Sequence, residues 1–193
     1  MQKDEVLRLM RDPKLLPSER LNLLSNIADQ ASSLKMPCYL VGGFVRDLLL
    51  GQPVNDFDFV VEGDAIKLGR KLVEMYGGKL TPHFKFHTAI WHLPDDWNLI
   101  PGTIDLITAR REMYEKPGAL PTVTPSTIDD DLRRRDFTVN AMALRLDGEG
   151  LGVLLDPMDG RSDLERGTIR ILHPLSFVDD PTRIFRAIRY EGR

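Results

Sequence analysis

Hydrophobic and polar positions follow two periods along the chain and divide it into helices and strands. Apolar residues recur every three to four positions in 3–11, 18–35 and 65–76, which predicts three amphipathic helices. Short apolar runs bounded by glycine, proline or polar turns predict strands. These runs lie at 38–41, 57–61, 79–86, 87–93, 102–108, 142–146 and 152–155. We therefore expect an α/β (α+β) fold, in which a small mixed or antiparallel sheet is backed by helices.

Glycine and proline mark further boundaries. Residues 44–50 form a predicted short helix that stops at Gly51, and the Asp180-Pro181 step has the composition of an ordinary helix start. The segment 110–126 is charged and contains several prolines. A loop of this length in a compact domain is typically functional or mobile. We expect this segment to be an irregular loop.

Composition narrows the class of protein. With 193 residues, 42% of them hydrophobic, the chain is long enough for one full domain and the beginning of a second. The single cysteine, Cys38, cannot form an internal disulfide, so a reducing, cytoplasmic location is expected. No run approaches the length of a membrane-spanning helix, and we expect no membrane partner. The net charge of −3 gives no overall basic footprint, so contacts with RNA would lie on a local patch or outside this chain.

The strongest chemical signal is a glycine turn followed by two carboxylates. Gly42 and Gly43 end a predicted strand and open a predicted helix, where backbone amides approach a phosphate closely. Asp56 and Asp58 stand two apart in a run of strand character, so their side chains point to the same side. Two acids on one face favour a cation between them, and hard oxygen ligands suit Mg²⁺ completed by phosphates. An Asp-x-Asp pair alone is more often solvated surface, but both signals together predict a metal that faces a triphosphate.

Asp105 is an acid inside an otherwise apolar predicted strand, between Ile104 and Leu106. Burial of an acid is costly unless the acid is paired or bound to metal. Asp105 is therefore either a third ligand beside the Asp-x-Asp pair or the partner of an arginine. His83 and His87 stand four apart, but their neighbours favour a strand over a zinc-binding helix, and no third ligand follows at a useful spacing.

A second cluster places arginines beside an acid and an amide. Arg134 and Arg135 belong to a run of three arginines, which in isolation indicates a solvated face. Asp136 and Asn140 follow, and their side chains can accept from and donate to sugar hydroxyls, while arginine binds phosphate with a planar fork. The cluster predicts a site for the sugar and phosphates of a nucleotide.

A third cluster stands at a predicted helix start. Asp180 and Arg183 are three apart and project from the same side of that helix. A carboxylate accepts from an exocyclic amine and a guanidinium donates to a ring acceptor, so this pair can satisfy cytosine or adenine. Guanine and uracil present the opposite polarity and would leave buried groups unpaired.

These clusters, in this order, resemble the motifs of the class II nucleotidyltransferases, the bacterial CCA-adding enzymes and poly(A) polymerases. The resemblance covers residues 38–190 and rests on Gly42-Gly43-Phe44-Val45-Arg46-Asp47, Asp56-x-Asp58, Arg134-Arg135-Asp136-Phe137-Thr138-x-Asn140-Ala141 and Asp179-Asp180-Pro181-Thr182-Arg183. It implies a template-independent RNA nucleotidyltransferase that adds CMP or AMP from CTP or ATP to the 3′ end of tRNA and releases pyrophosphate. Its activity would be CCA addition or repair.

The resemblance also implies a role for each motif. Asp56 and Asp58 would hold two Mg²⁺ ions, and Asp105 would complete the first metal site. Asp136 would favour ribose over deoxyribose. The remaining nucleotide-binding residues would be Gly42, Gly43, Arg46, Asp47, Arg134, Arg135 and Asn140, with Asp180 and Arg183 as the protein template for the base. For Arg46 and Asp47, a local salt bridge explains the pair as well as triphosphate contact does.

The resemblance divides the chain into a nucleotidyltransferase head, 1–145, and a hinge with the beginning of a helical neck, 146–193. Family members continue into regions that grip tRNA, so we expect an amino-terminal part that binds nucleotide. Two residues depart from the family pattern. Asp179 stands for a glutamate, and His87 stands where many relatives carry glycine, which would alter how closely substrate approaches that strand.

Several alternatives stay open at this point. Within the class, the protein would be an A-adding or CC-adding tRNA nucleotidyltransferase or a poly(A) polymerase. The amino-acid sequence of residues 114–121 is similar to that of the subgroup that contains A-adding as well as CCA-adding enzymes. Small-molecule nucleotidyltransferases share the glycine turn and Asp-x-Asp but need no base template at Asp180 and Arg183. A catalytically silent RNA-binding module is opposed by the three carboxylates and the negative net charge.

Overall fold

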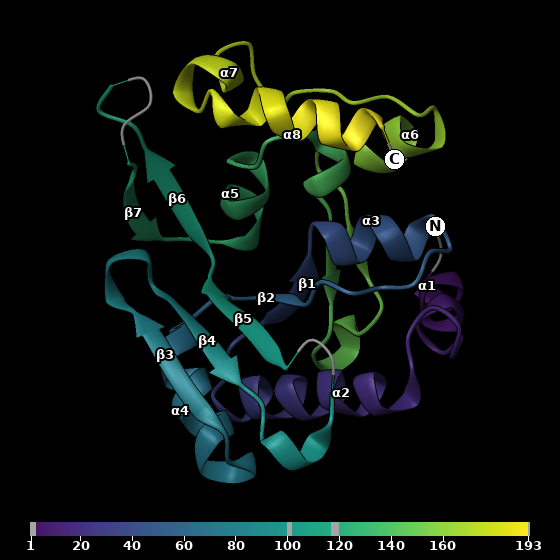
Figure 1. The fold of residues 1–193 in the computed structure, drawn as a ribbon, viewed down its shortest axis with the longest axis vertical. Helices are drawn as coiled ribbons and strands as arrows, with labels where there is room; N and C mark the ends of the chain where they lie inside the picture. Colours follow the sequence, from purple (N-terminus) through teal and green to yellow (C-terminus); the bar gives the residue numbers. More distant parts are fainter. Residues whose placement is uncertain (1–2, 100–101, 117–119, 193) are drawn as a thin grey trace.

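A seven-stranded mixed sheet organises the residues that the computed structural model describes, 3–99, 102–116 and 120–192 (Figure 1). Its strands are β1 (Cys38–Val41), β2 (Asp58–Val61), β3 (Lys79–His83), β4 (Thr88–His92), β5 (Thr103–Thr108), β8 (Ala143–Arg145) and β9 (Leu154–Leu155). Strands β6 (Arg110–Met113) and β7 (Thr122–Pro125) form a separate two-stranded sheet. The order in the larger sheet is β3-β4-β5-β2-β1-β8-β9, antiparallel throughout except for the parallel pair β2 and β5. The expected fold class is confirmed.

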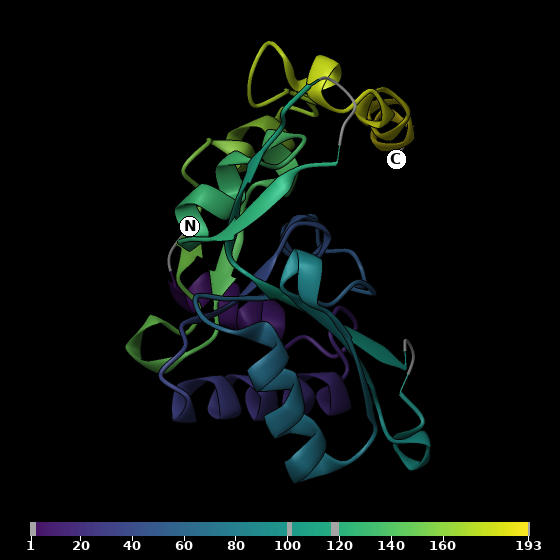
Figure 2. The ribbon, with the colours of Figure 1, turned by 90° about the vertical axis from the view of Figure 1, so that its left-hand side faces the viewer.

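Helices cover both faces of this sheet. Apolar residues of α2 (Ser18–Ser33), α3 (Gly43–Leu49) and α4 (Ala65–Tyr76) pack on one face and those of α5 (Ile128–Arg133) on the other. The other described α-helices are α1 (Lys3–Met10), α6 (Gly160–Glu165), α7 (Ser176–Asp179) and α8 (Thr182–Glu191). Figures 1 and 2 show α7 and α8 at the end of the molecule opposite α2 and α4. Within the described ranges, no helix combines the length and the apolar character needed to cross a membrane.

Alternation along the central strands decides which face each side chain reaches. Leu40 and Phe59 belong to the main core, which includes apolar residues of α2, α3 and α4. Their neighbours Tyr39 and Val60 belong to a smaller core on the other face, with apolar residues of α5. Asp58 lies two positions before Val60 and therefore points to the α5 side of the sheet. The strand pattern thus places this carboxylate away from the main core.

Local sequence signals set several element boundaries. Helix α4 begins where the Asp64 carboxylate accepts hydrogen bonds from the backbone amides of Ile66 (2.9 Å) and Lys67 (3.0 Å), and it ends at Gly77, whose φ is 82°. Helix α2 ends before the expected position because Lys35, with a φ of 58°, leaves the helical conformation. The predicted strands at 38–41 and 102–108 are confirmed, the second beginning one residue later.

The expectation of an irregular loop at 110–126 is wrong for most of that segment. Strands β6 and β7 pair as an antiparallel two-stranded sheet, with Arg110 opposite Pro125 and Met113 opposite Thr122. The charged residues that indicated a loop instead form ion pairs on one side of β6, where the Glu112 carboxylate pairs with Arg110 and Arg134. The tip at 117–119 lies outside the described residues.

The predicted strand at 79–86 ends early. Strand β3 stops at His83 and a 3₁₀ turn, Phe84–Phe86, follows. His87 then adopts a left-handed conformation with a φ of 52°. Glycine adopts this conformation without steric cost, whereas a histidine there carries backbone strain.

Candidate active site

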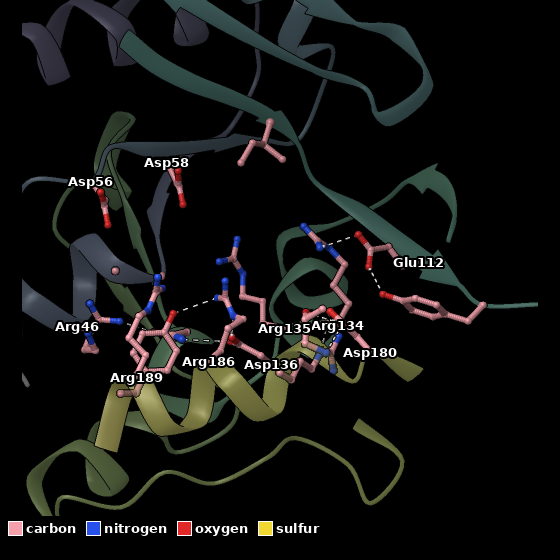
Figure 3. Close-up of a pocket in the computed structure, with 18 residues that line it drawn as sticks. Arg46, Asp56, Asp58, Glu112, Arg134, Arg135, Asp136, Asp180, Arg186 and Arg189 are labelled. Carbon is pink, nitrogen blue, oxygen red and sulfur yellow. Dashed lines mark hydrogen bonds and ion pairs between the residues drawn. The ribbon is translucent and has the colours of Figure 1, made fainter. Parts of the chain in front are cut away.

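A cavity of about 680 Å³ lies between the α5 face of the sheet and helix α8 (Figure 3). Its lining includes every predicted site residue except Asp47 and Asp105. The structure therefore gathers the glycine turn, the Asp-x-Asp pair, the arginine cluster and the Asp180/Arg183 pair in one place. Figure 3 shows the two carboxylates on the sheet side of the cavity and the arginines of α8 on the opposite side.

The glycine turn packs tightly because it carries no side chains. Gly42 has a φ of 64°, and a Cβ there would lie 3.0 Å from Nη1 of Arg135. A Cβ on Gly43, the first residue of α3, would lie 3.4 Å from Oδ2 of Asp56. The turn therefore lies directly against a guanidinium and a carboxylate of the cavity. A larger residue in the turn would displace these side chains.

Asp56 and Asp58 differ in their backbone setting, since only Asp58 lies within a strand. Asp58 is the first residue of β2, whereas Asp56 precedes that strand, so the expectation that both acids lie within one strand is wrong. Asp105 pairs with Asp58 in the parallel register of β2 and β5, so both point to the same face, but Asp105 does not line the cavity. Among the described residues, no three acidic, histidine or cysteine side chains gather closely enough to hold a metal ion. Asp105 is exposed, so the expectation that it is a buried acid is wrong, and its role as a third ligand stays a prediction.

Electrostatics at these carboxylates favour a cation. Burial raises the pKa of Asp58 above its usual value; Arg135 opposes the shift, and Asp105 and Asp56 add to it. Partial burial and the Asp56 carboxylate likewise raise the pKa of Asp105. Within the described part of the chain, neither Asp56 nor Asp58 forms an ion pair with a basic side chain. The pKa of Asp58 stays raised although Arg135 opposes the shift, and a bound divalent cation would relieve the remaining repulsion between the carboxylates, so these residues fit a metal.

Arg134 and Arg135, the arginine pair of the site, are fixed from below by one buried acid. Asp131 is 0% exposed, and its two oxygens lie 2.7 Å from Nη2 of Arg134 and 2.9 Å from Nη2 of Arg135. Although burial opposes the shift, Arg135 and Arg134 lower the pKa of Asp131, so it stays ionised. Nε of Arg135 is buried and has no hydrogen-bond partner among the described residues. The pair is therefore held in place at the cavity, where guanidinium groups suit an anionic ligand.

A hydrogen-bonded chain joins α3 to α8 along one side of the cavity. Arg46 donates from Nη1 to Oδ1 of Asn140 (2.8 Å), and Asn140 donates to Oδ1 of Asp136 (3.1 Å). Arg186 of α8 donates from Nε to Oδ2 of Asp136 (2.6 Å). Asp47 forms the local salt bridge with Arg46 at 2.7 Å and takes no part in the cavity lining.

Asp180 and Arg183 reach the cavity from the start of α8. The Asp180 carboxylate accepts from the backbone amide of Thr182 (3.0 Å), which is the bond of an ordinary helix start. Arg183 is 6% exposed and donates to Oγ of Ser176 (2.7 Å) and to the carbonyl oxygen of Arg134 (3.3 Å). Nε of Arg183 lies 3.8 Å from Oδ2 of Asp180. The pair thus offers an acceptor and a donor side by side on the cavity wall.

Sequence reasoning missed several lining residues. Those with polar side chains are Glu112, Tyr114, Thr182, Arg186, Arg189 and Tyr190. Two signals were present. Glu112 and Tyr114 stand two apart on one side of β6 and its extension, and Arg186 and Tyr190 follow Arg183 at helical spacing. Burial and Glu112 raise the pKa of Tyr114 to about 12, so its hydroxyl stays protonated and donates to Glu112 (3.0 Å).

Comparison with known proteins identifies a family with which this chain shares sequence and structure. Residues 38–170 match the model of the poly(A) polymerase head domain. The chain is 47% identical over 178 residues to the A-adding tRNA nucleotidyltransferase of Halalkalibacterium halodurans, covering 92% of this chain and 40% of that protein. It is 43% identical over 182 residues to the CC-adding tRNA nucleotidyltransferase of Deinococcus radiodurans, covering 93% of this chain and 46% of that protein. The chain thus spans less than half the length of these curated relatives.

Solved structures agree. An apo CCA-adding enzyme is similar with a TM-score of 0.86 and 47% identity, covering 97% of this chain and 43% of that chain. CCA-adding enzymes complexed with CTP, with ATP and, from Thermotoga maritima, with tRNA are each 44% identical, with TM-scores of 0.81, 0.80 and 0.81 over 97% of this chain and 40% of each of those chains. The family match spans more than half of this chain, and the same fold recurs at this level of identity. The chain belongs to the poly(A) polymerase head-domain family of nucleotidyltransferases.

Proposed function

We propose that this chain is the nucleotide-binding part of a template-independent tRNA nucleotidyltransferase. It transfers CMP or AMP from CTP or ATP to the 3′ end of tRNA, in CCA addition or repair, and releases pyrophosphate. The observation that carries the proposal is that one cavity is lined by the two carboxylates Asp56 and Asp58, the anchored arginine pair and the Asp180/Arg183 pair. The relatives solved with CTP, ATP and tRNA support it.

Nucleotidyltransferases of this family depend generally on a divalent metal. In this chain, Asp56 and Asp58 would hold two Mg²⁺ ions, with Asp105 beside them on the same face of the sheet. When bound, Mg²⁺ lowers the pKa of an attacking hydroxyl and neutralises charge on the departing pyrophosphate. The raised pKa of Asp58 supports this assignment, because a cation offsets the cost of keeping that carboxylate ionised.

The protein's own groups bind and orient the nucleotide. Arg134 and Arg135 present guanidinium donors to the triphosphate, and their ion pairs with Asp131 fix them before the ligand arrives, so little reorganisation is needed. Asp136 accepts from a ribose hydroxyl. Asp180 accepts from the exocyclic amine of cytosine or adenine, and Arg183 donates to the adjacent ring acceptor.

The proposal includes a division of the chain. The head, 1–145, ends with strand β8, and 146–193 contains the hinge and the beginning of the neck, including α7 and α8. Most tRNA contacts would lie outside this chain, which fits its net charge of −3. A cytoplasmic location is where such an enzyme would meet tRNA, CTP and ATP.

Nucleotide incorporation tests the function. We would incubate the chain with Mg²⁺, one labelled nucleoside triphosphate and a high concentration of tRNA that lacks the terminal CCA, or that ends in C or CC. We expect label from CTP, from ATP or from both in sequence, and none with Asp58→Asn. Transfer from CTP alone or ATP alone would indicate CC addition or A addition, and repeated AMP addition a poly(A) polymerase. Equal transfer from all four triphosphates, or transfer that survives Asp58→Asn, would contradict the proposal.

A further inference from the structure

The Asp136 carboxylate has one acceptor position left among the described residues. Its side chain is 7% exposed. Oδ1 already accepts from the backbone amide of Phe137 (2.9 Å) and from Asn140 (3.1 Å). Oδ2 accepts from Nε of Arg186 at 2.6 Å. Because a carboxylate oxygen has two lone pairs, the remaining acceptor position is on Oδ2, beside the Arg186 guanidinium.

Arg186 connects this carboxylate to the helix that carries Arg183. Both arginines belong to α8, and Arg186 also donates from Nη2 to the hydroxyl of Tyr190 (3.1 Å). The Tyr190 ring lies 5.2 Å from the guanidinium of Arg46, which belongs to α3 of the head. The contacts of Arg186 and Tyr190 therefore dock α8 against the residues around Asp136.

We propose that Arg186 is a positioning residue for ribose recognition: it holds Oδ2 of Asp136 so that a single acceptor position faces the nucleotide sugar. The inference rests on the proposed function, in which Asp136 accepts from a ribose hydroxyl. It adds a residue that lies outside the Asp-x-x-Arg pair on the same helix. Through α8, the same contact couples reading of the sugar to placement of the base-reading Arg183.

The physical reason is the cost of an unpaired buried acceptor. With Arg186 in place, a 2′-deoxyribose leaves the last acceptor position of a nearly buried carboxylate empty, and that cost separates ribose from deoxyribose. Without Arg186, Oδ2 has two free positions and an open side through which water can satisfy them. The penalty against deoxyribose then falls, although Asp136 itself is unchanged.

The test compares ATP with 2′-deoxyATP in one set of variants of this chain. Dissociation constants for both nucleotides are measured with Mg²⁺ for the wild type, Arg186→Met and Arg189→Met. Arg189 is a matched comparison because it lies on the same helix, lines the same cavity and contacts the Tyr190 ring at 5.4 Å, but it makes no bond to Asp136. Since both nucleotides compete for the same folded molecules, the ratio of the two constants is insensitive to partial unfolding.

We expect Arg186→Met to weaken ATP binding by about tenfold and 2′-deoxyATP binding much less, so that the preference for ribose falls. Arg189→Met should weaken both nucleotides alike. In an Asp136→Asn background, Arg186→Met should no longer change the ratio. An unchanged ratio in Arg186→Met, or an equal change in the two arginine variants, would overturn the inference.

Failure of the inference and failure of the proposed function give different results. A wild-type chain that binds ATP and 2′-deoxyATP equally overturns the role of Arg186 while leaving a nucleotide site in place. A wild-type chain that binds neither nucleotide overturns the proposed function and this inference with it.

Discussion

Asp131 is the buried acid beneath the arginine pair, and Asp131→Asn isolates the contribution of its charge. The asparagine keeps the size and one acceptor oxygen but removes the negative charge that faces Arg134 and Arg135. In the wild type, Asp131 accepts from Nε and Nη2 of Arg134 at 2.9 and 2.7 Å, and from Nη2 of Arg135 at 2.9 Å. The variant therefore leaves two guanidinium groups without their shared counter-ion.

The structure sets the size of the effect. Removing one partner of a buried ion pair costs about 3–5 kcal/mol. In the wild type, the Arg134 and Arg135 side chains are 18% and 14% exposed, so water reaches them in part. Arg134 also has an ion pair with Glu112, which the variant retains. We therefore expect the lower end, a loss of about 3 kcal/mol in the free energy of unfolding. For a domain of this size that loss lowers the urea midpoint by about 1.5 M.

Urea unfolding at several pH values measures this contribution. Because the pKa of Asp131 is lowered in the folded protein, its stabilisation is fully present above the usual aspartate pKa, about 4. The difference between the wild type and Asp131→Asn should therefore be constant near neutral pH. It should shrink as the pH falls below about 4 toward the lowered pKa, where the wild-type carboxylate becomes protonated.

Asp129→Asn is the matched control. Asp129 lies on the same helix and pairs with Arg133 at 2.7 Å, but both side chains are about half exposed. Exposed pairs of this kind contribute little, so this variant should shift the midpoint far less than Asp131→Asn. Equal shifts in the two variants, or a loss in Asp131→Asn that does not change with pH, would contradict a stabilising role for the Asp131 charge.

Two further predictions concern the sheet side of the cavity. Gly42→Ala and Gly51→Ala both place alanine at a positive φ, 64° and 66°, and should each lose about 1 kcal/mol of stability. Only Gly42→Ala should also weaken ATP binding in a titration, because its Cβ would lie 3.0 Å from Arg135 whereas nothing lies within 4 Å at Gly51; equal affinities in the two variants would contradict this. Without ligand and at neutral pH, Asp58→Asn should raise the melting temperature. The pKa of Asp58 is raised in the folded protein, which means that the ionised carboxylate lowers the stability of the wild type. The gain should therefore vanish at lower pH, where the wild-type Asp58 is protonated. The same variant should lose the additional stabilisation by Mg²⁺ that we expect in the wild type, and a retained Mg²⁺ effect would argue against Asp58 as a ligand.

Local patterns were enough to predict much of the fold. The helix at 65–76 and the strand at 38–41 have the expected bounds because their caps, glycines and apolar periods lie within the elements themselves. The 110–126 segment was misjudged because its β6 strand depends on a distant partner. The Glu112 side chain is 7% exposed and forms an ion pair with Arg134, which lies twenty-two residues later in the chain. A single sequence gives no direct sign of such a contact.

The site shows the same division. The motifs predicted many of the residues that line the cavity, because each combines residue types suited to one part of a nucleotide. They did not predict that Arg186 bonds to Asp136 across fifty residues, or that a parallel pairing of β2 and β5 brings Asp105 to its expected place beside Asp58. Both facts depend on how distant segments pack. The sequence leaves salt bridge and triphosphate contact equally open for Arg46 and Asp47, and the structure contains the salt bridge, at 2.7 Å.

The most direct test of the account is the base selectivity of the cavity. Binding of ATP, CTP, GTP and UTP is measured with Mg²⁺ for the wild type, for Asp180→Ala and for Asp179→Ala, a neighbouring acid that does not line the cavity. We expect the wild type and Asp179→Ala to prefer ATP and CTP, and Asp180→Ala to lose this preference. Equal binding of all four nucleotides by the wild type, or a preference that persists in Asp180→Ala, would contradict a protein template at Asp180 and Arg183.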